Sequence, residues 1–184
     1  MTKEITSRII SFVVSAVLLS IHVEAAPNQC SDVSSLLLPD VRITAAETVA
    51  DSASLTGRIK VPHCEVSGVI GTEIRFELLL PDDWNNRFFM GGGGGYVGSV
   101  QNSAIRTVTL GYATIGTDTG HQSDGLLAGW ALDHPERQVN FGHLAIHRTA
   151  EVAKAVIRAY YGSGPEYSYF KGCSRGGGQA LMEA

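Results

Sequence analysis

Residues 167–177 read YSYFKGCSRGG and combine the pattern of a short strand with that of a sharp turn. Tyr167 to Lys171 predict the strand, and Gly172 predicts a turn directly after it. Gln179 to Glu183 then predict the opening turns of a helix. An order of strand, turn and helix is typical of α/β proteins, so this stretch already indicates the fold class.

Gly172 to Gly176 match the Gly-x-Ser-x-Gly pattern of a nucleophile elbow, and the flanking strand and helix give the context that this pattern requires. Glycine two positions before and after the serine avoids a collision in the strained turn that exposes the hydroxyl group. The pattern predicts Ser174 as a nucleophile at the carboxyl end of a central strand. It also predicts the backbone N–H of Arg175, at a helix N-terminus, as an oxyanion donor. The alternative is a Gly-Ser loop that only ends a strand.

Five consecutive glycines, Gly91 to Gly95, follow the predicted strand Arg87 to Met90. In hydrolases of this architecture, the loop after an earlier strand gives a second oxyanion donor. Glycine lets a backbone N–H approach a substrate carbonyl closely, so the run predicts that donor, with Gly94 as the first choice. A phosphate-binding loop is the alternative, but the Gly-Lys-Ser/Thr ending of a P-loop is absent.

The rest of the sequence alternates short strands with one long helix. Strands are predicted at Val41 to Thr44, Thr48 to Lys60, Ile70 to Leu80 and Leu110 to Gly116, and the first three predict an antiparallel sheet. Apolar residues recur at helical spacing from Phe141 to Tyr161, which predicts the best helix of the chain. Together with the elbow, these elements predict an α/β-hydrolase fold.

All six histidines precede Ser174, although the acid and histidine partners follow the serine in α/β-hydrolases. His143 and His147, four residues apart with Glu151 one turn on, have a spacing that suits a metal ion. The pair lacks the glutamate of the HExxH pattern, which favours surface or packing histidines and predicts no metal site. For His121, in a loop after a strand, a structural role is favoured over approach to the cleft. None of them is predicted as the general base.

Residues 1–26 resemble a secretory signal peptide. Lys3 and Arg8 precede the apolar run Ile9 to Ile21, and small residues follow. This run is shorter than the roughly 20 residues that span a bilayer, so a membrane anchor is the less favoured alternative. We predict a secreted or periplasmic protein with one domain, residues 27–184, and no membrane contact after signal removal.

The sequence has three cysteines, and export would place them in an oxidising compartment. Cys30 and Cys64 enclose short, strand-like segments, and we predict a disulfide between them. Cys173 is then left over, which indicates a partner elsewhere or a reactive thiol.

The chain has 184 residues, of which 44% are hydrophobic and 17% charged, as is usual for globular proteins. Its formal net charge of −4 gives no general attraction to a phosphate backbone, so nucleic acid is not an expected partner. The sequence makes no statement about oligomeric state.

Several motifs together resemble the tannase and feruloyl esterase family of secreted serine hydrolases. They are Phe88 to Tyr96, Thr117 to His121, Trp130 to Glu136, the helix around His147, and Tyr169 to Gly177. The resemblance covers most of residues 27–184. It implies a Ser–His–Asp triad with Ser174 as the nucleophile, and an ester of a phenolic or other aromatic acid as the small-molecule substrate.

The resemblance also implies features that this sequence does not contain. In the family, the cysteine before the nucleophile is bonded to a cysteine beside the catalytic histidine, so Cys173 is expected to pair with a cysteine outside this chain. A lid domain, which holds calcium in many members, is normally inserted after this point. We therefore expect the amino-terminal part of an incomplete α/β-hydrolase domain, without a cofactor and inactive alone. The alternative is a catalytically dead remnant or a secreted binding module.

Two positions depart from the family pattern. Gly178 stands where relatives usually carry Arg, and Asn140 stands where Asp is usual. The resemblance implies that an ion pair beneath the elbow is missing here.

Overall fold

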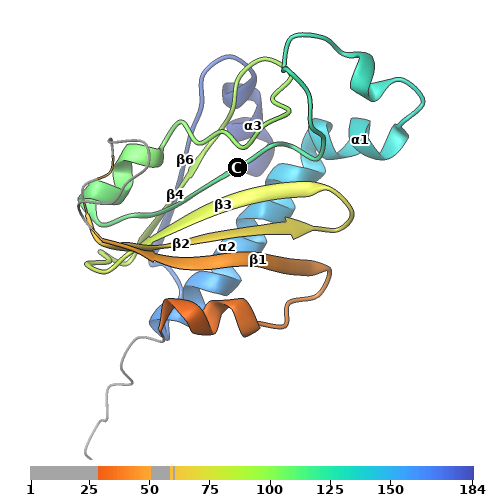
Figure 1. The fold of residues 1–184 in the computed structure, drawn as a ribbon. Helices are drawn as coiled ribbons and strands as arrows, with labels where there is room; N and C mark the ends of the chain where they lie inside the picture. Colours follow the sequence, from red (N-terminus) through yellow and green to blue (C-terminus); the bar gives the residue numbers. More distant parts are fainter. Residues whose placement is uncertain (1–28, 51–58, 60) are drawn as a thin grey trace, which may run out of the picture.

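A mixed six-stranded sheet in the order β1-β2-β3-β5-β4-β6 forms the centre of the computed structural model, which describes residues 29–50, 59 and 61–184 (Figure 1). The predicted signal peptide, residues 1–26, lies outside the described residues, and so does most of the predicted strand Thr48 to Lys60. Three helices and several short helical turns accompany these strands in the described part of the chain. The α/β class predicted from the sequence is confirmed.

The antiparallel half of the sheet is a meander of three strands. These are β1 (Val41–Val49), β2 (His63–Ile70) and β3 (Ile74–Pro81), paired in that order. The prediction of one strand from Ile70 to Leu80 was wrong, because Gly71 turns the chain at a φ of +59° between β2 and β3. No strand was predicted over residues 63–69, which form most of β2. Gly68 lies inside β2 opposite Phe76, where an added Cβ would lie 2.5 Å from the Phe76 ring.

The parallel half contains β4 (Arg87–Gly91), β5 (Ala113–Thr117) and β6 (Tyr167–Lys171). β4 lies between the other two and runs parallel to both. The predicted strand Leu110 to Gly116 starts later than expected, since Leu110 ends a 3₁₀ turn. β6 has the predicted bounds, but it is an edge strand of the described sheet and not the central strand that was predicted before Ser174.

Two helices lie on the connection between β5 and β6, and a third follows β6. They are α1 (Pro135–Val139), α2 (Ala145–Tyr161) and α3 (Arg175–Glu183). The 3₁₀ turns are η1 (Cys30–Ser35), η2 (Ile105–Leu110) and η3 (Gly129–Ala131). The helix predicted from Phe141 begins at Ala145, because the preceding segment η4 (Asn140–Leu144) winds as a π turn. Among the described residues, no helix has the length and apolar character needed to cross a membrane.

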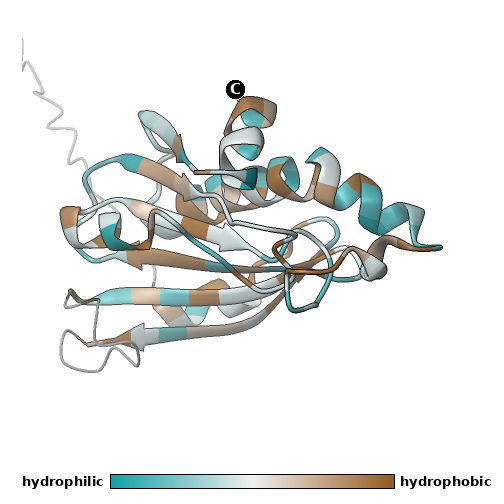
Figure 2. Cartoon of the chain, turned by 90° about the horizontal axis from the view of Figure 1, so that it is seen from above, coloured by the Kyte–Doolittle hydropathy of each residue, from teal (hydrophilic) through white to brown (hydrophobic). Residues whose placement is uncertain are grey.

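The main core lies between the sheet and α2. Hydrophobic and hydrophilic bands alternate along the strands (Figure 2), and in β3 this alternation buries Phe76, Leu78 and Leu80 on the α2 side. Val156 and Ile157 of α2 are fully buried against them. This alternation places the three side chains in the core, whereas Leu79, on the opposite face of β3, is buried in a second cluster with Ile59 and Val108.

The predicted disulfide between Cys30 and Cys64 is present and ties η1 to β2, with a Cα–Cα distance of 5.5 Å. Both cysteines are buried in the main core. The disulfide thus joins η1 to the amino-terminal end of β2.

Candidate active site

The carboxyl ends of the parallel strands bring the glycine run and the elbow together. β4 and β6 are neighbours in register, with Gly91 opposite Lys171. Their loops therefore leave the same edge of the sheet, which is the usual ligand-binding edge of α/β sheets. Directly after the strands, the Gly92 N–H donates to the carbonyl oxygen of Lys171 at 2.8 Å.

Ser174 occupies the strained position of the elbow. Its φ of +55° and ψ of −122° lie in a region that non-glycine residues rarely adopt, and strain of this kind gathers at functional sites. α3 begins at the next residue, Arg175, and not at Gln179 as predicted. Ser174 and the unpaired Cys173 are both exposed to solvent.

A cleft of about 520 Å³ opens between the elbow and the glycine loop. It is lined by Gly92, Gly93, Gly94, Gln101, Asn102, Ser103, Cys173 and Ser174. The structure thus unites the two elements that the sequence analysis singled out separately. No histidine of the described segments lines this cleft together with Ser174.

The backbone donors around the cleft differ in their partners. The Gly93 N–H donates to Gln179 Oε1 at 3.0 Å, and the Gly94 N–H donates to Gln101 Oε1 at 2.9 Å. For the Arg175 N–H, no acceptor is present in the described part of the chain. Arg175 therefore offers an open donor at a helix N-terminus, whereas Gly94 must share or exchange its glutamine partner to bind a substrate oxygen.

Sequence reasoning missed Gln101 and Gln179. Gln179 is buried, and it reaches the glycine loop from a position 86 residues away. Neither glutamine belongs to a recognisable motif, so no sequence signal was available to find them.

The histidines lie away from this cleft. His143 and His147 are exposed, and His147 Nδ1 lies 3.3 Å from Glu183 Oε2. Within the ranges that the structure describes, no three His, Cys, Asp or Glu side chains are grouped as a metal site requires. His121 is fully buried, in agreement with the structural role that the sequence analysis favoured.

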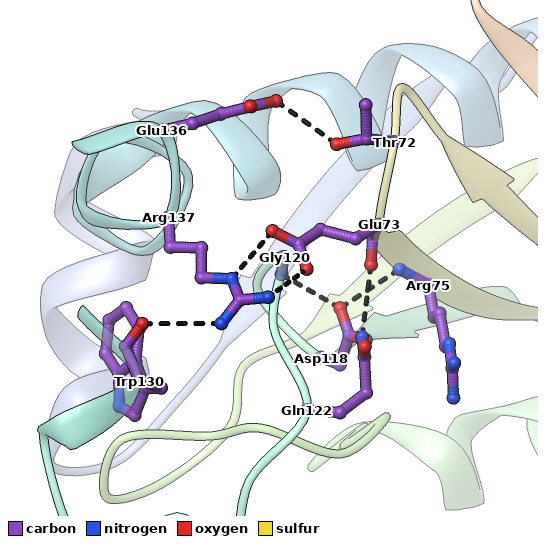
Figure 3. Close-up of polar contacts among 9 residues, drawn as sticks. All are labelled: Thr72, Glu73, Arg75, Asp118, Gly120, Gln122, Trp130, Glu136 and Arg137. Atoms are coloured by element: carbon purple, nitrogen blue, oxygen red, sulfur yellow. Dashed lines mark hydrogen bonds and ion pairs between the residues drawn. The ribbon is translucent and has the colours of Figure 1, made fainter. Parts of the chain in front are cut away.

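A polar network holds the loop after β5 against β3 and the turn before it (Figure 3). Asp118 accepts hydrogen bonds from the Gly120 N–H at 2.9 Å, the Arg75 N–H at 3.0 Å and Gln122 Nε2 at 2.6 Å. Its backbone carbonyl accepts from the Gly98 N–H at 3.1 Å. Burial raises the pKa of Asp118 although these hydrogen bonds oppose the shift. Asp118 therefore joins the loops after β4 and β5.

Arg137, in α1, extends the network to Glu73. Its guanidinium makes two hydrogen bonds to Glu73, from Nε to Oε1 at 2.9 Å and from Nη2 to Oε2 at 3.0 Å (Figure 3). A paired geometry of this kind fixes orientation as well as adding energy. The segment before α2 is thereby tied to the turn between β2 and β3.

His121 packs inside this assembly without a polar partner. Its ring stacks on Trp130 at 3.7 Å, and neither ring nitrogen has a hydrogen-bond partner in the described structure. Burial and then the charge of Arg137 lower the pKa of His121, and the charge of Glu73 acts in the opposite direction. The neutral imidazole is therefore the form that the fold favours.

This environment predicts acid sensitivity. Since the folded pKa of His121 is lowered, the unfolded chain binds more protons as the pH falls from about 6.5, and stability falls with it. We expect His121→Phe, which keeps an aromatic ring but does not titrate, to reduce the drop in unfolding temperature between pH 7.5 and about pH 5 by roughly 3 °C. The measurement is a thermal melt at each pH. The exposed His134, changed to Phe, is the control, and an equal reduction in both variants would contradict the prediction.

Comparisons with known proteins agree with this geometry. The tannase and feruloyl esterase family matches residues 59–184. A mono(2-hydroxyethyl) terephthalate hydrolase of Piscinibacter sakaiensis is 33% identical over 162 residues, which are 75% of this chain and 26% of that protein. A probable feruloyl esterase of Arthroderma benhamiae is 42% identical over 114 residues, which are 58% of this chain and 21% of that protein.

A solved structure agrees as well. An esterase from Aspergillus oryzae superposes with a TM-score of 0.67 and 28% identity, covering 81% of this chain and 32% of the other. The chain thus spans about a third or less of the length of these relatives. Because the family match extends over the glycine loop, the elbow and most of the described residues, the chain belongs to the tannase and feruloyl esterase family.

Proposed function

We propose that this protein is a carboxylic ester hydrolase that works through a serine acyl-enzyme. One observation carries the proposal: Ser174, strained at a positive φ after β6, shares its cleft with the glycine loop that follows β4. A nucleophile and backbone donors in one open cleft are the parts that acyl transfer needs. Family membership supports the same reaction class.

In the proposed reaction, Ser174 Oγ attacks the ester carbonyl carbon while its proton passes to a base. The negative charge that develops on the carbonyl oxygen is held by the Arg175 N–H, at the positive end of α3, and by a glycine N–H of residues 91–95, for which Gly94 is our candidate. Collapse of the intermediate expels the alcohol and leaves an acyl-serine. Water then attacks this ester, releases the acid and restores the Ser174 hydroxyl group.

The base and its acidic partner are proposed to come from sequence outside this chain. No histidine lines the cleft within the described residues, and the relatives are about three or more times longer than the part matched here. The exposed Cys173 beside the nucleophile is proposed to form a disulfide with a cysteine from that same outside sequence. By this proposal, residues 27–184 are the amino-terminal part of the catalytic domain.

For the substrate we propose a small-molecule ester of a phenolic or other aromatic acid. The support is the relatives, which include a probable feruloyl esterase and a terephthalate ester hydrolase. We also propose export through the predicted signal peptide, to the periplasm or outside the cell.

A fluorophosphonate probe tests the serine mechanism, because it labels a serine only where that serine is activated. We expect the complete gene product to gain one label, located by peptide mass spectrometry on Ser174. Residues 27–184 alone are expected to stay unlabelled under the same conditions. A complete gene product that is folded but unlabelled at Ser174 would contradict the proposal and favour a catalytically dead remnant or a secreted binding module.

A further inference from the structure

The segment η4 is a π turn between two α-helices, next to the elbow. Its wider winding directs the Ala145 N–H to the carbonyl oxygen of Asn140, five residues back. In an α-helix this N–H would donate to the carbonyl of Phe141. The Phe141 carbonyl therefore lacks its α-helical donor, and π turns of this kind are frequent at functional sites.

The guanidinium of Arg175 supplies the missing donor. Its Nη2 donates to the carbonyl oxygen of Phe141 and, at 3.1 Å, to that of Gly142. Its Cζ also lies 4.2 Å from the centre of the Phe141 ring, within the range of a cation–π contact. Because the side chain is half-buried, these contacts are partly shielded from water. The carbonyl oxygens hold the edge of the guanidinium, and the Phe141 ring contacts the group as well.

Aromatic contacts also hold the π turn, on the side of the glycine loop. The Phe141 ring packs against Trp130 at 5.1 Å and against Tyr96 at 5.9 Å. Tyr96 directly follows the glycine run, and its N–H donates to the carbonyl of Gly125 at 2.9 Å. Arg175 therefore packs against an aromatic cluster that is connected through Tyr96 to the end of the glycine run.

We infer that the side chain of Arg175 is a positioning group for the backbone N–H of the same residue. The peptide between Ser174 and Arg175 carries the open donor of the cleft, and it follows a strained residue that has no side-chain capping bond. Anchoring the guanidinium on η4 limits rotation of this peptide and keeps its N–H directed toward the carbonyl oxygen of the substrate. The inference rests on the proposed oxyanion role of that N–H.

The test compares Arg175→Met and Arg175→Lys in the complete gene product, with a nitrophenyl ester as substrate. Displacing an oxyanion donor destabilises the transition state more than the bound substrate. We therefore expect Arg175→Met to lower kcat about 10- to 100-fold while KM stays within about threefold. The affinity for phenylboronic acid, which forms a tetrahedral adduct with the serine, should fall by a similar factor. Arg175→Lys should recover part of both losses, because an ammonium group can still reach a carbonyl of the π turn.

Arg148→Met is the matched control, since Arg148, in the first turn of α2, pairs with Glu151 and with Asp40 before β1 and does not line the cleft. It should leave kcat and KM unchanged. If Arg175→Met keeps the kcat and boronate affinity of the wild type while turnover still requires Ser174, the positioning inference is wrong and the proposed function stands. If turnover persists in Ser174→Ala, the proposed function fails and takes this inference with it.

A second variant covers the case in which Arg175→Met does not fold. Phe141→Leu removes the ring beside the guanidinium but keeps the backbone carbonyls of η4. We expect kcat to fall at nearly constant KM, by less than in Arg175→Met. An unchanged kcat in a folded Phe141→Leu protein with a Ser174-dependent wild type would overturn the inference.

Discussion

Ser174→Ala is expected to lower kcat/KM of the complete gene product for a nitrophenyl ester by a factor on the order of 10⁵. Only the hydroxyl group is removed, so the proposed oxyanion donors and the cleft remain. Residual turnover would then come from those donors and from substrate binding alone. Initial rates over a range of substrate concentrations, with the background hydrolysis subtracted, give the comparison.

Ser34→Ala is the control for this experiment. Ser34 is exposed in η1, where its hydroxyl donates to the carbonyl of Ser31, and it lies in an element remote from the parallel edge of the sheet. Its loss should leave kcat/KM unchanged. A Ser174→Ala protein with more than about one tenth of the wild-type kcat/KM would show that another group is the nucleophile.

Gly172→Ala is expected to remove both activity and stability. An added methyl carbon at this position would lie 2.6 Å from Gly176 Cα and still closer to the carbonyl group of Gly176. All of these are backbone atoms of the elbow, so no side-chain rotation can relieve the overlap. We expect a loss of about 3 to 5 kcal/mol, measured as a drop of roughly 10 °C in the unfolding temperature.

Gly129→Ala is the matched substitution, because an added methyl carbon there meets no atom within 4 Å. The unfolding temperature of this variant should stay within about 2 °C of the wild type. Equal losses in the two variants would show that the general loss of a glycine, and not the elbow contact, causes the effect. An active Gly172→Ala protein would contradict the strained geometry of Ser174.

Local patterns were sufficient for the parts of the fold that carry the chemistry. The elbow was predictable because Gly172 and Gly176 mark one short turn between a strand and a helix. The disulfide between Cys30 and Cys64 was also predicted correctly. The nucleophile and the oxyanion donors themselves remain predictions until the variants are measured.

Features that depend on distant contacts were missed. β2 was not predicted because Gly68 has the appearance of a turn residue. Glycine is needed at this position because the Phe76 ring on the neighbouring strand leaves no room for a Cβ. The π turn of η4 and the partner of Gly93 depend on tertiary packing in the same way. Periodicity depends on neighbours along the sequence, whereas these tertiary contacts exist only after the sheet has formed.

The order of strands in the sheet has a consequence for folding kinetics. The meander β1-β2-β3 pairs strands that are close in sequence, and such contacts form with little loss of chain entropy. β6 pairs with β4 across a long intervening segment that contains α2, and the contact between Gly93 and Gln179 closes a loop of 86 residues. We therefore expect the carboxyl ends of β4 and β6, with the cleft beside Ser174, to form after the antiparallel half of the sheet has folded.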